Sequence, residues 1–161
     1  MTGLQTVERS DTISLAALTE EVFCDLDPVA DKHQIRLIQT EGDCTVTGSY
    51  ILLYRAVYNL VENAIKYNRP SGSVTVSIHT AESAVLEVTD TGIGISPENQ
   101  EKIFDPFYRV DKSRSRAMGG AGLGLALVSE IARQHKGQVK VTQSSEKGST
   151  IALILPKSTD Y

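Results

Sequence analysis

Three polar side chains of one predicted helix could bind a cation and phosphate groups together. Asn59, Asn63 and Lys66 stand at positions i, i+4 and i+7, so on a helix they lie on one face. Neutral amide oxygens are ligands that magnesium accepts, and an ammonium group is a point charge for phosphate oxygens. Two asparagines one turn apart are more often a solvated helix face, so this interpretation depends on the motifs that follow.

A carboxylate followed by glycines forms the second candidate site. Asp90 closes a hydrophobic strand, on the same face as Leu86 and Val88, and precedes Thr-Gly-Ile-Gly at 91–94. A carboxylate buried on that face needs a hydrogen-bond partner. The exocyclic amine of adenine is such a donor, and glycines let the backbone approach a planar ring closely. The alternative is a carboxylate that caps its own loop in an Asx-turn.

A second glycine-rich segment, residues 119–125, leads directly into a predicted helix. Backbone N–H groups and the positive end of the helix dipole make such a junction an anion site. The sequence has neither G-x-x-x-x-G-K-[ST] nor a complete G-x-G-x-x-G, and it lacks the H-R-D and D-F-G motifs of protein kinases. The segment therefore predicts a nucleotide site of another kind, and a glycine hinge for the preceding loop is a compatible alternative.

The elements that position these groups follow from the hydrophobic periodicity. We expect helices over about 15–33, 50–67 and 123–136, and strands over 35–38, 45–47, 74–79, 86–90, 138–143 and 150–155. Ser14 is the expected N-cap of the first helix. Pro28 predicts that this helix bends or ends early.

Three further segments lie outside these elements. Residues 4–13 predict an edge strand or a loop, and 96–103 predict a short helix that begins at Ser96-Pro97. Residues 105–121 show no periodicity and predict a long loop. A loop of that length is usually functional, so we interpret it as a lid.

Composition limits the classes of function. A chain of 161 residues suits one domain, and 40% hydrophobic with 22% charged residues is typical of soluble globular proteins. The net charge of −4 gives no reason to expect nucleic acid, whereas the basic cluster within 109–116 suits a small anion. Cys24 and Cys44 form no C-x-x-C pair and are expected to be buried free thiols. No apolar run is long enough for a membrane span, so we expect no membrane contact by this domain.

The motifs, in their order and spacing, resemble those of the ATP-binding catalytic domain of sensor histidine kinases. This domain belongs to the GHKL superfamily, which includes gyrase, MutL and the heat-shock chaperone ATPases. The matching segments are 59–67 (N box), 90–94 (first glycine box), 103–109 (F box) and 120–125 (second glycine box). The resemblance predicts a catalytic domain at 4–157 with an ATP lid at 105–121. It implies an α/β two-layer sandwich of the Bergerat type, with a mixed sheet of about five strands packed on about three helices.

The resemblance also implies which residues act at the phosphates. Asn63 is expected to hold magnesium, with Asn59 beside the phosphates and Lys66 reaching one of them. Arg109 and Arg114 of the lid are expected to approach the γ-phosphate. Asn59, Lys66 and the two arginines are thus the expected catalytic residues.

At the other end of the nucleotide, Asp90 is expected to accept a hydrogen bond from the adenine amine. Thr150 is expected to support Asp90 through water. The other expected nucleotide contacts are Tyr67, Gly92, Gly94, Tyr108, Gly120, Gly122, Leu123, Gly124 and Leu125. Ala121 departs from the family pattern, which often has Thr there, so one hydroxyl contact to phosphate would be lost.

The function that the resemblance implies is phosphoryl transfer in two-component signalling. The domain would bind Mg-ATP and pass the γ-phosphoryl group to a histidine on a separate dimerisation domain, from which a response regulator would take it. The acceptor histidine of the family precedes Glu or Asp, and none of His33, His79 and His135 does. We therefore expect the dimerisation domain to be absent and the chain not to autophosphorylate alone. We also expect a monomeric, cytoplasmic domain whose parent is anchored in the membrane.

Other functions remain open at this point. Gyrase-like and MutL-like relatives hydrolyse ATP as a conformational switch and carry Glu where Asn59 stands; an amide cannot act as a general base, although Glu62 is nearby. A degenerate nucleotide-binding module is disfavoured by Asn63, Asp90 and the glycines. A serine kinase of the anti-sigma-factor type shares the motifs, but the F box and the long lid favour the histidine kinase.

Overall fold

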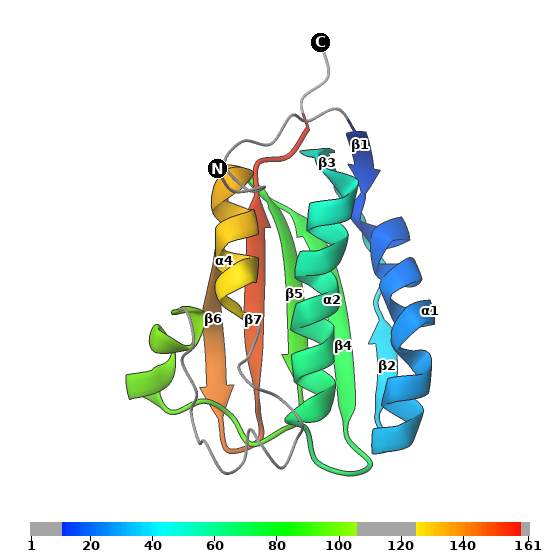
Figure 1. Cartoon of the computed structure of the whole chain (residues 1–161), viewed down its shortest axis with the longest axis vertical. Coiled ribbons are helices and arrows are strands. Elements are labelled where there is room, and N and C mark those ends of the chain that lie inside the picture. Colours follow the sequence, from blue (N-terminus) through cyan, green and yellow to red (C-terminus); the bar gives the residue numbers. More distant parts are fainter. Residues whose placement is uncertain (1–10, 106–124, 159–161) are drawn as a thin grey trace.

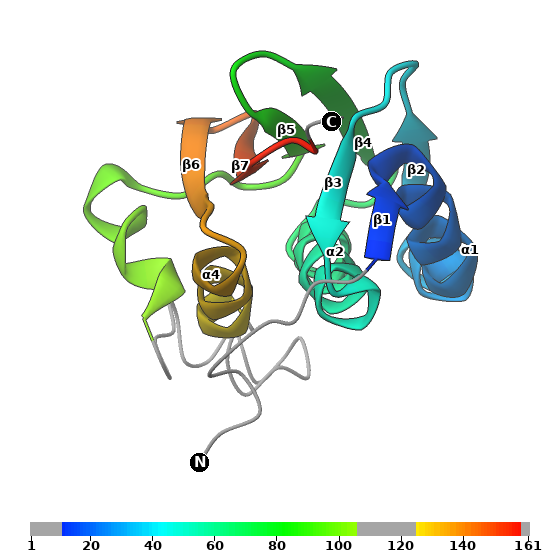
Figure 2. The same ribbon diagram turned by 90° about the horizontal axis from the view of Figure 1, so that it is seen from above.

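The helices cover one face of a mixed five-stranded sheet, so the fold is a two-layer α/β sandwich (Figure 1, Figure 2). The computed structural model describes residues 11–105 and 125–158. The elements are β1 (Asp11–Ser14), α1 (Leu15–His33), β2 (Arg36–Gln39), β3 (Thr45–Gly48), α2 (Tyr50–Lys66), β4 (Ser73–Thr80), β5 (Ala84–Asp90), the 3-10 turns η1 (Pro97–Asn99) and η2 (Lys102–Phe104), α4 (Leu125–Gln134), β6 (Gln138–Ser145) and β7 (Gly148–Leu155). The predicted fold class is confirmed.

The order of strands places β5, which carries Asp90, in the middle of the sheet. The order is β2-β4-β5-β7-β6, with β2 parallel to β4 and the other neighbours antiparallel, while β1 and β3 pair separately. Val74 and Val76 of β4 and Leu86 and Val88 of β5 are at most 3% exposed, because this face packs against the helices. The period of two along a strand then turns the last residue of β5 toward the helical layer. No helix within residues 11–105 and 125–158 is long and apolar enough to cross a bilayer.

Helix α1 begins as predicted but does not end at its proline. The Ser14 hydroxyl accepts a hydrogen bond from the Ala17 N–H at 3.1 Å, which confirms the N-cap. The helix ends at His33, as the periodicity predicts, and continues for five residues beyond Pro28, so of the two alternatives at this proline the early end is excluded. Pro28 is exposed, while Leu26 and Ala30 on either side are buried. Their packing maintains the helix although one backbone donor is missing.

Helix α2 buries one side and presents the polar groups on the other. The Ser49 hydroxyl accepts from the Leu52 N–H at 3.2 Å and caps the first turn. Its buried residues are Leu53, Ala56, Val57, Leu60, Val61, Ala64 and Ile65. Asn59, Asn63 and Lys66 are each half-buried at the border of this stripe.

The segment predicted as one short helix at 96–103 is two separate 3-10 turns. Pro97 begins η1, as expected, but no side chain caps the turn. In η2, Ile103 is 2% exposed and joins the core. A single anchoring apolar residue favours a short turn over a continuous amphipathic helix.

One imidazole joins the end of α4 to the start of α2. His135 Nδ1 lies 2.8 Å from the Ile131 carbonyl oxygen, and Nε2 accepts the Ser49 N–H at 3.1 Å. A donor at Nδ1 and an acceptor at Nε2 correspond to the neutral ring. Helix α4 ends at Gln134, two residues before the predicted end, and Lys136 takes a left-handed conformation with φ 63°. Gly48 cannot carry a side chain, because a Cβ would strike the imidazole ring.

We expect His135→Ala to lower the free energy of unfolding by about 1–3 kcal/mol, because the variant leaves the Ser49 N–H without its acceptor. Urea unfolding followed by circular dichroism measures the change. His79→Ala is the matched control: His79 is an exposed strand residue, and its removal is expected to change stability by less than about 0.5 kcal/mol. Equal losses in the two variants would contradict the linking role of His135.

Candidate nucleotide site

Asp90 ends β5 as a half-buried carboxylate held by three hydrogen bonds. Its Oδ1 accepts the Gly92 N–H at 2.8 Å and the Ser149 N–H at 3.3 Å, and its Oδ2 accepts the Ser149 hydroxyl at 2.9 Å. A carboxylate offers about four acceptor positions. The bonds formed within the described residues therefore leave Oδ2 able to accept from a further donor. The loop-capping contact and a ligand contact are compatible.

The electrostatic setting of Asp90 is typical of a binding carboxylate. Burial raises the pKa of Asp90 above its usual range, and the hydrogen bonds from Gly92 and Ser149 lower it again only in part. A carboxylate that has lost its hydrating water, and whose hydrogen bonds replace that water only in part, is stabilised by one more hydrogen-bond donor. Such groups cluster at functional sites.

The residue that supports Asp90 is Ser149, and the expectation for Thr150 is corrected. Ser149 is the register partner of Asp90 across the β5–β7 ladder, so both side chains lie on the same face of the sheet. Thr150 pairs with Thr89, and their hydroxyls hydrogen bond at 2.9 Å on the opposite face. The alternation of side chains along a strand prevents Thr150 from reaching Asp90. The signal that could have found Ser149 was the pairing register, which the sequence does not display.

The loop after Asp90 packs tightly against the C-terminal end of α2. A Cβ at Gly92 would lie 2.5 Å from the carbonyl oxygen of Tyr67, the C-cap residue of α2. Gly94 has φ 79°, and a Cβ there would collide with the Ser145 carbonyl oxygen. Both glycines are thus required by the close approach of the loop to its neighbours. Their contact with the base, and that of Tyr67, remain predictions.

A side-chain network that the sequence did not predict fixes this loop to α2. Asn68 Oδ1 accepts the Thr91 hydroxyl at 2.9 Å, and Asn68 Nδ2 donates to the Ser73 carbonyl at 2.9 Å. The Ser73 N–H in turn donates to Thr91 Oγ1 at 2.9 Å. The network joins the end of the N-box helix to the first glycine loop. The two ends of the candidate site are therefore held in one fixed geometry.

The polar stripe of α2 has the donor chemistry of a magnesium and phosphate site. Asn63 Nδ2 donates to the Asn59 carbonyl at 3.1 Å, which orients the amide and turns its oxygen away from that carbonyl. A neutral hard oxygen of this kind fits magnesium, which is usually also held by the phosphates of the nucleotide. Lys66 Nζ lies 3.6 Å from Glu62 Oε2, in a pair whose side chains are about 30% exposed. Such a pair contributes little, so a phosphate can compete for Lys66.

Several predicted contacts lie outside the described residues. These are Tyr108, Arg109, Arg114, Gly120, Gly122, Leu123 and Gly124. Most of the predicted lid at 105–121 lies there too. Leu125 is described, and its side chain is 3% exposed within the core, so only its backbone remains for a nucleotide contact.

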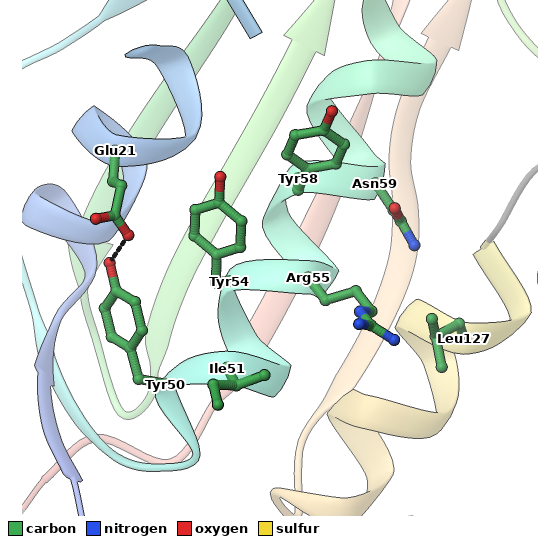
Figure 3. A pocket seen from close by; sticks show the side chains of 8 residues that line it. All are labelled: Glu21, Tyr50, Ile51, Tyr54, Arg55, Tyr58, Asn59 and Leu127. Atoms are coloured by element: carbon green, nitrogen blue, oxygen red, sulfur yellow. Dashed lines mark hydrogen bonds between the residues drawn. The ribbon is translucent and has the colours of Figure 1, made fainter. Parts of the chain in front are cut away.

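A groove on the outer side of the helices begins at Asn59 (Figure 3). We call it the α2 groove. It has a volume of about 510 Å³ and is lined by Glu21 of α1, Leu127 of α4, and Tyr50, Ile51, Tyr54, Arg55, Tyr58 and Asn59 of α2. Among the predicted nucleotide contacts in the described part of the chain, Asn59 alone lines it. The groove is therefore next to the candidate site and does not contain Asp90.

We expect Ser149→Ala to weaken ATP binding by about 3- to 10-fold, because Asp90 loses a hydrogen bond that holds its carboxylate in place. Isothermal titration calorimetry measures the affinity. Thr150→Val is the control on the opposite face of β7 and should leave the affinity unchanged. A similar loss in both variants would contradict the assignment of Ser149.

Known proteins share both the sequence pattern and the fold of this chain. The sequence profile of the family described as histidine kinase-, DNA gyrase B-, and HSP90-like ATPase matches residues 48–159. Sensor-like histidine kinase SenX3 of Mycobacterium tuberculosis is 38% identical over 157 residues, which are 96% of this chain and 38% of SenX3. The chain thus spans well under half the length of this curated relative.

Solved structures give the same result. The mycobacterial sensor histidine kinase MprB superposes with a TM-score of 0.78 and 28% identity, over 93% of this chain and 99% of that structure. Full-length ShkA in complex with AMPPNP gives a TM-score of 0.79 and 25% identity, over 96% of this chain and 32% of ShkA. The resemblance to sensor histidine kinases is confirmed. The chain belongs to the family of histidine kinase-, DNA gyrase B- and HSP90-like ATPases, whose domains bind ATP.

Proposed function

We propose that this chain is the catalytic domain of a two-component sensor kinase. It binds Mg-ATP and delivers the γ-phosphoryl group to a histidine on a dimerisation domain, from which a response regulator receives it. The proposal is supported by the family match, by the sensor kinase SenX3 and by the nucleotide complex of ShkA.

The observation that carries the proposal is that the fold connects two parts of the candidate site, the polar face of α2 and the carboxylate at the end of β5. Asp90 presents an acceptor position to an adenine amine, and the face of Asn59, Asn63 and Lys66 suits phosphates and a cation. The Asn68–Thr91 hydrogen bond, at 2.9 Å, connects the two. A purine at one end and phosphates at the other is the ligand that both chemistries fit.

The residues of this chain act by binding and orientation. In the proposed transfer, an imidazole nitrogen of the acceptor forms a bond to the γ-phosphorus while the bond from that phosphorus to the β–γ bridging oxygen breaks and ADP leaves. Magnesium, held by Asn63, would supply charge neutralisation at the phosphates. Asp90 fixes the base, and Lys66 exchanges Glu62 for a phosphate oxygen. Catalysis of this class consists mostly of positioning and charge stabilisation.

Direct hydrolysis of ATP is the weaker alternative. Gyrase-like and MutL-like relatives activate water with a Glu at the position of Asn59. The Asn59 amide is not basic enough to act as a general base. Glu62 stands three residues after Asn59 on α2, so it does not take the position of that Glu. The amide at Asn59 therefore favours transfer to an acceptor over a hydrolytic switch.

We further propose that the domain comprises residues 4–157, with its lid at 105–121 and its magnesium ligand at Asn63. The dimerisation domain and the response regulator are its partners, without nucleic acid or membrane contact. We place the domain in the cytoplasm, where ATP is supplied, as a monomer. Its parent protein is anchored in the membrane. Arg109 and Arg114 are its proposed γ-phosphate contacts.

The test combines this chain, γ-labelled ATP and the dimeric phosphoacceptor domain of the same kinase. Label is expected on the acceptor domain and absent from this chain, in a reaction that requires magnesium. Label on this chain without the acceptor domain would contradict the division of labour. Release of free phosphate as the main product would favour the hydrolytic switch.

A further inference from the structure

Asn68 stands where the two parts of the candidate site meet. It is the first residue after the segment that resembles the N box, and it follows Tyr67, the C-cap residue of α2. At the same edge of the sheet β4 begins and β5 ends, because Val74 pairs with Asp90 (Figure 1). The proposed contacts to phosphate, magnesium and adenine do not include Asn68, although it lies between them along the fold.

The Asn68 side chain makes three hydrogen bonds, which together fix its direction. Its Oδ1 accepts the Arg69 N–H at 2.8 Å and the Thr91 hydroxyl at 2.9 Å, and its Nδ2 donates to the Ser73 carbonyl at 2.9 Å. An amide oxygen has two lone pairs, so both acceptor positions of Oδ1 are occupied. One side chain thus holds the start of β4 and the residue that follows β5.

Ser73 and Thr91 close these contacts into a ring. The Ser73 N–H donates to Thr91 Oγ1 at 2.9 Å, and the Ser73 carbonyl accepts the Thr91 N–H at 3.3 Å in addition to Asn68 Nδ2. The ring also leaves no free space, since a Cβ at Gly72 would lie 2.4 Å from both Asn68 Oδ1 and Thr91 Oγ1. Hydrogen bonds that close on one another in a packed site hold their members in one geometry.

The ring acts on Asp90 through the next two residues of the loop. Thr91 follows Asp90 directly, and the Gly92 N–H donates to Asp90 Oδ1 at 2.8 Å. A Cβ at Gly92 would lie 3.2 Å from the Asn68 Cα, so this donor packs against Asn68 itself. Ser149 holds the carboxylate from β7, and Asn68 holds the donating loop from the side of α2. The direction of the remaining acceptor position on Oδ2 therefore depends on both supports.

We propose that Asn68 is a positioning residue for purine selection: it holds Thr91 and Gly92 so that the Asp90 carboxylate accepts the amine of adenine and repels the carbonyl of guanine. An acceptor discriminates between an amine and a carbonyl only while it cannot turn away from the carbonyl. The inference rests on the proposed function and adds the residue that makes the adenine contact selective. Asn68 acts through the loop and makes no contact with the nucleotide.

The test measures selectivity, which a merely structural role would not change. Asn68→Ala is expected to raise the Kd for ATP by about fivefold and to change the Kd for GTP by less than about twofold. The ratio of the two constants therefore falls. Isothermal titration calorimetry gives the first constant, and competition against ATP gives the second. Both are measured at a temperature at which circular dichroism shows the variant to be folded.

Gln39→Ala is the matched control. Gln39 is half-buried, as Asn68 is, and its Nε2 donates to the Ala16 carbonyl at 3.0 Å. This amide–carbonyl bond joins α1 to β2, which lies two strands away from β5 in the sheet. Its loss should leave both constants and their ratio unchanged, whatever it does to the free energy of unfolding.

A second pair of variants tests the same contact without truncating the amide. Thr91→Val keeps the shape of the side chain but removes the hydroxyl, so it should reduce the selectivity as Asn68→Ala does. Thr91→Ser keeps the hydroxyl and should retain the selectivity of the unmutated chain. Because both residues act through one contact, the double variant Asn68→Ala, Thr91→Val should lose little more than either single variant.

The outcomes separate the inference from the proposed function. If Asn68→Ala and Thr91→Val keep the ratio of the unmutated chain, the positioning role of Asn68 is wrong and the proposed function stands. Equal affinities of the unmutated chain for ATP and GTP would also overturn the inference. Transfer of label from ATP to the phosphoacceptor domain tests the proposed function separately in each case.

Discussion

Asp90→Asn is expected to weaken ATP binding by about 1–3 kcal/mol and to leave the folded state at least as stable as before. The amide keeps an oxygen to accept from the Gly92 and Ser149 N–H groups, and its nitrogen can donate to the Ser149 hydroxyl in place of Oδ2. The protein network therefore survives, while the acceptor for the adenine amine becomes a donor. Calorimetry measures the first effect and thermal unfolding the second.

The pH dependence of stability has a definite sign at Asp90. Because burial raises the folded-state pKa, the protonated carboxyl favours folding in acid, and this contribution is lost as pH rises through the raised pKa. Asp90→Asn has no carboxyl group to ionise, so near neutral pH its free energy of unfolding should equal or exceed that of the unmutated chain.

GTP should also compete poorly with ATP for the site, since the carbonyl of guanine would face the Asp90 carboxylate. Equal affinities for ATP and GTP would contradict the role of Asp90.

Asn63→Ala is expected to remove the gain in nucleotide affinity that magnesium provides and to slow phosphoryl transfer by at least about 100-fold. The fold should be unaffected, because Asn63 is only half-buried and its bond from Nδ2 to the Asn59 carbonyl lies within one helix. Contact with adenine should also remain, since Asp90 is unchanged. Nucleotide titrations with and without magnesium measure the difference.

Asn63→Asp is the matched control, because a carboxylate retains a hard oxygen for the cation. Its nucleotide affinity should still rise with magnesium. If magnesium raises the affinity of Asn63→Ala as much as that of the unmutated chain, Asn63 is not the ligand.

Hydrophobic periodicity was sufficient to predict most elements of this fold. The N-cap Ser14 and the long helices α1 and α2 lie where their patterns place them. Pro28 does not end α1 because the cost of a proline is local, whereas the buried stripe on both sides of it is a property of the whole helix. The parallel pairing of β2 with β4 could not be predicted either, since it depends on a crossover that leaves no periodic signal.

The candidate site was predictable in type but not in its supporting contacts. Asp90 was identified because a carboxylate on an apolar strand face needs a partner, and this reasoning uses local sequence alone. Ser149 was missed in favour of its neighbour Thr150, because a shift of one residue along β7 moves a side chain to the other face. The link from Asn68 to Thr91 joins segments 23 residues apart and required the folded structure.

The chemical nature of the bond formed in the reaction tests the central claim most directly. After incubation of this chain with magnesium, γ-labelled ATP and the phosphoacceptor domain, the labelled protein is treated with acid and, separately, with alkali. Phosphoryl transfer to a histidine predicts label on the acceptor domain that is lost in acid and retained in alkali. Acid-stable label, or free phosphate released equally fast without the acceptor domain, would contradict it.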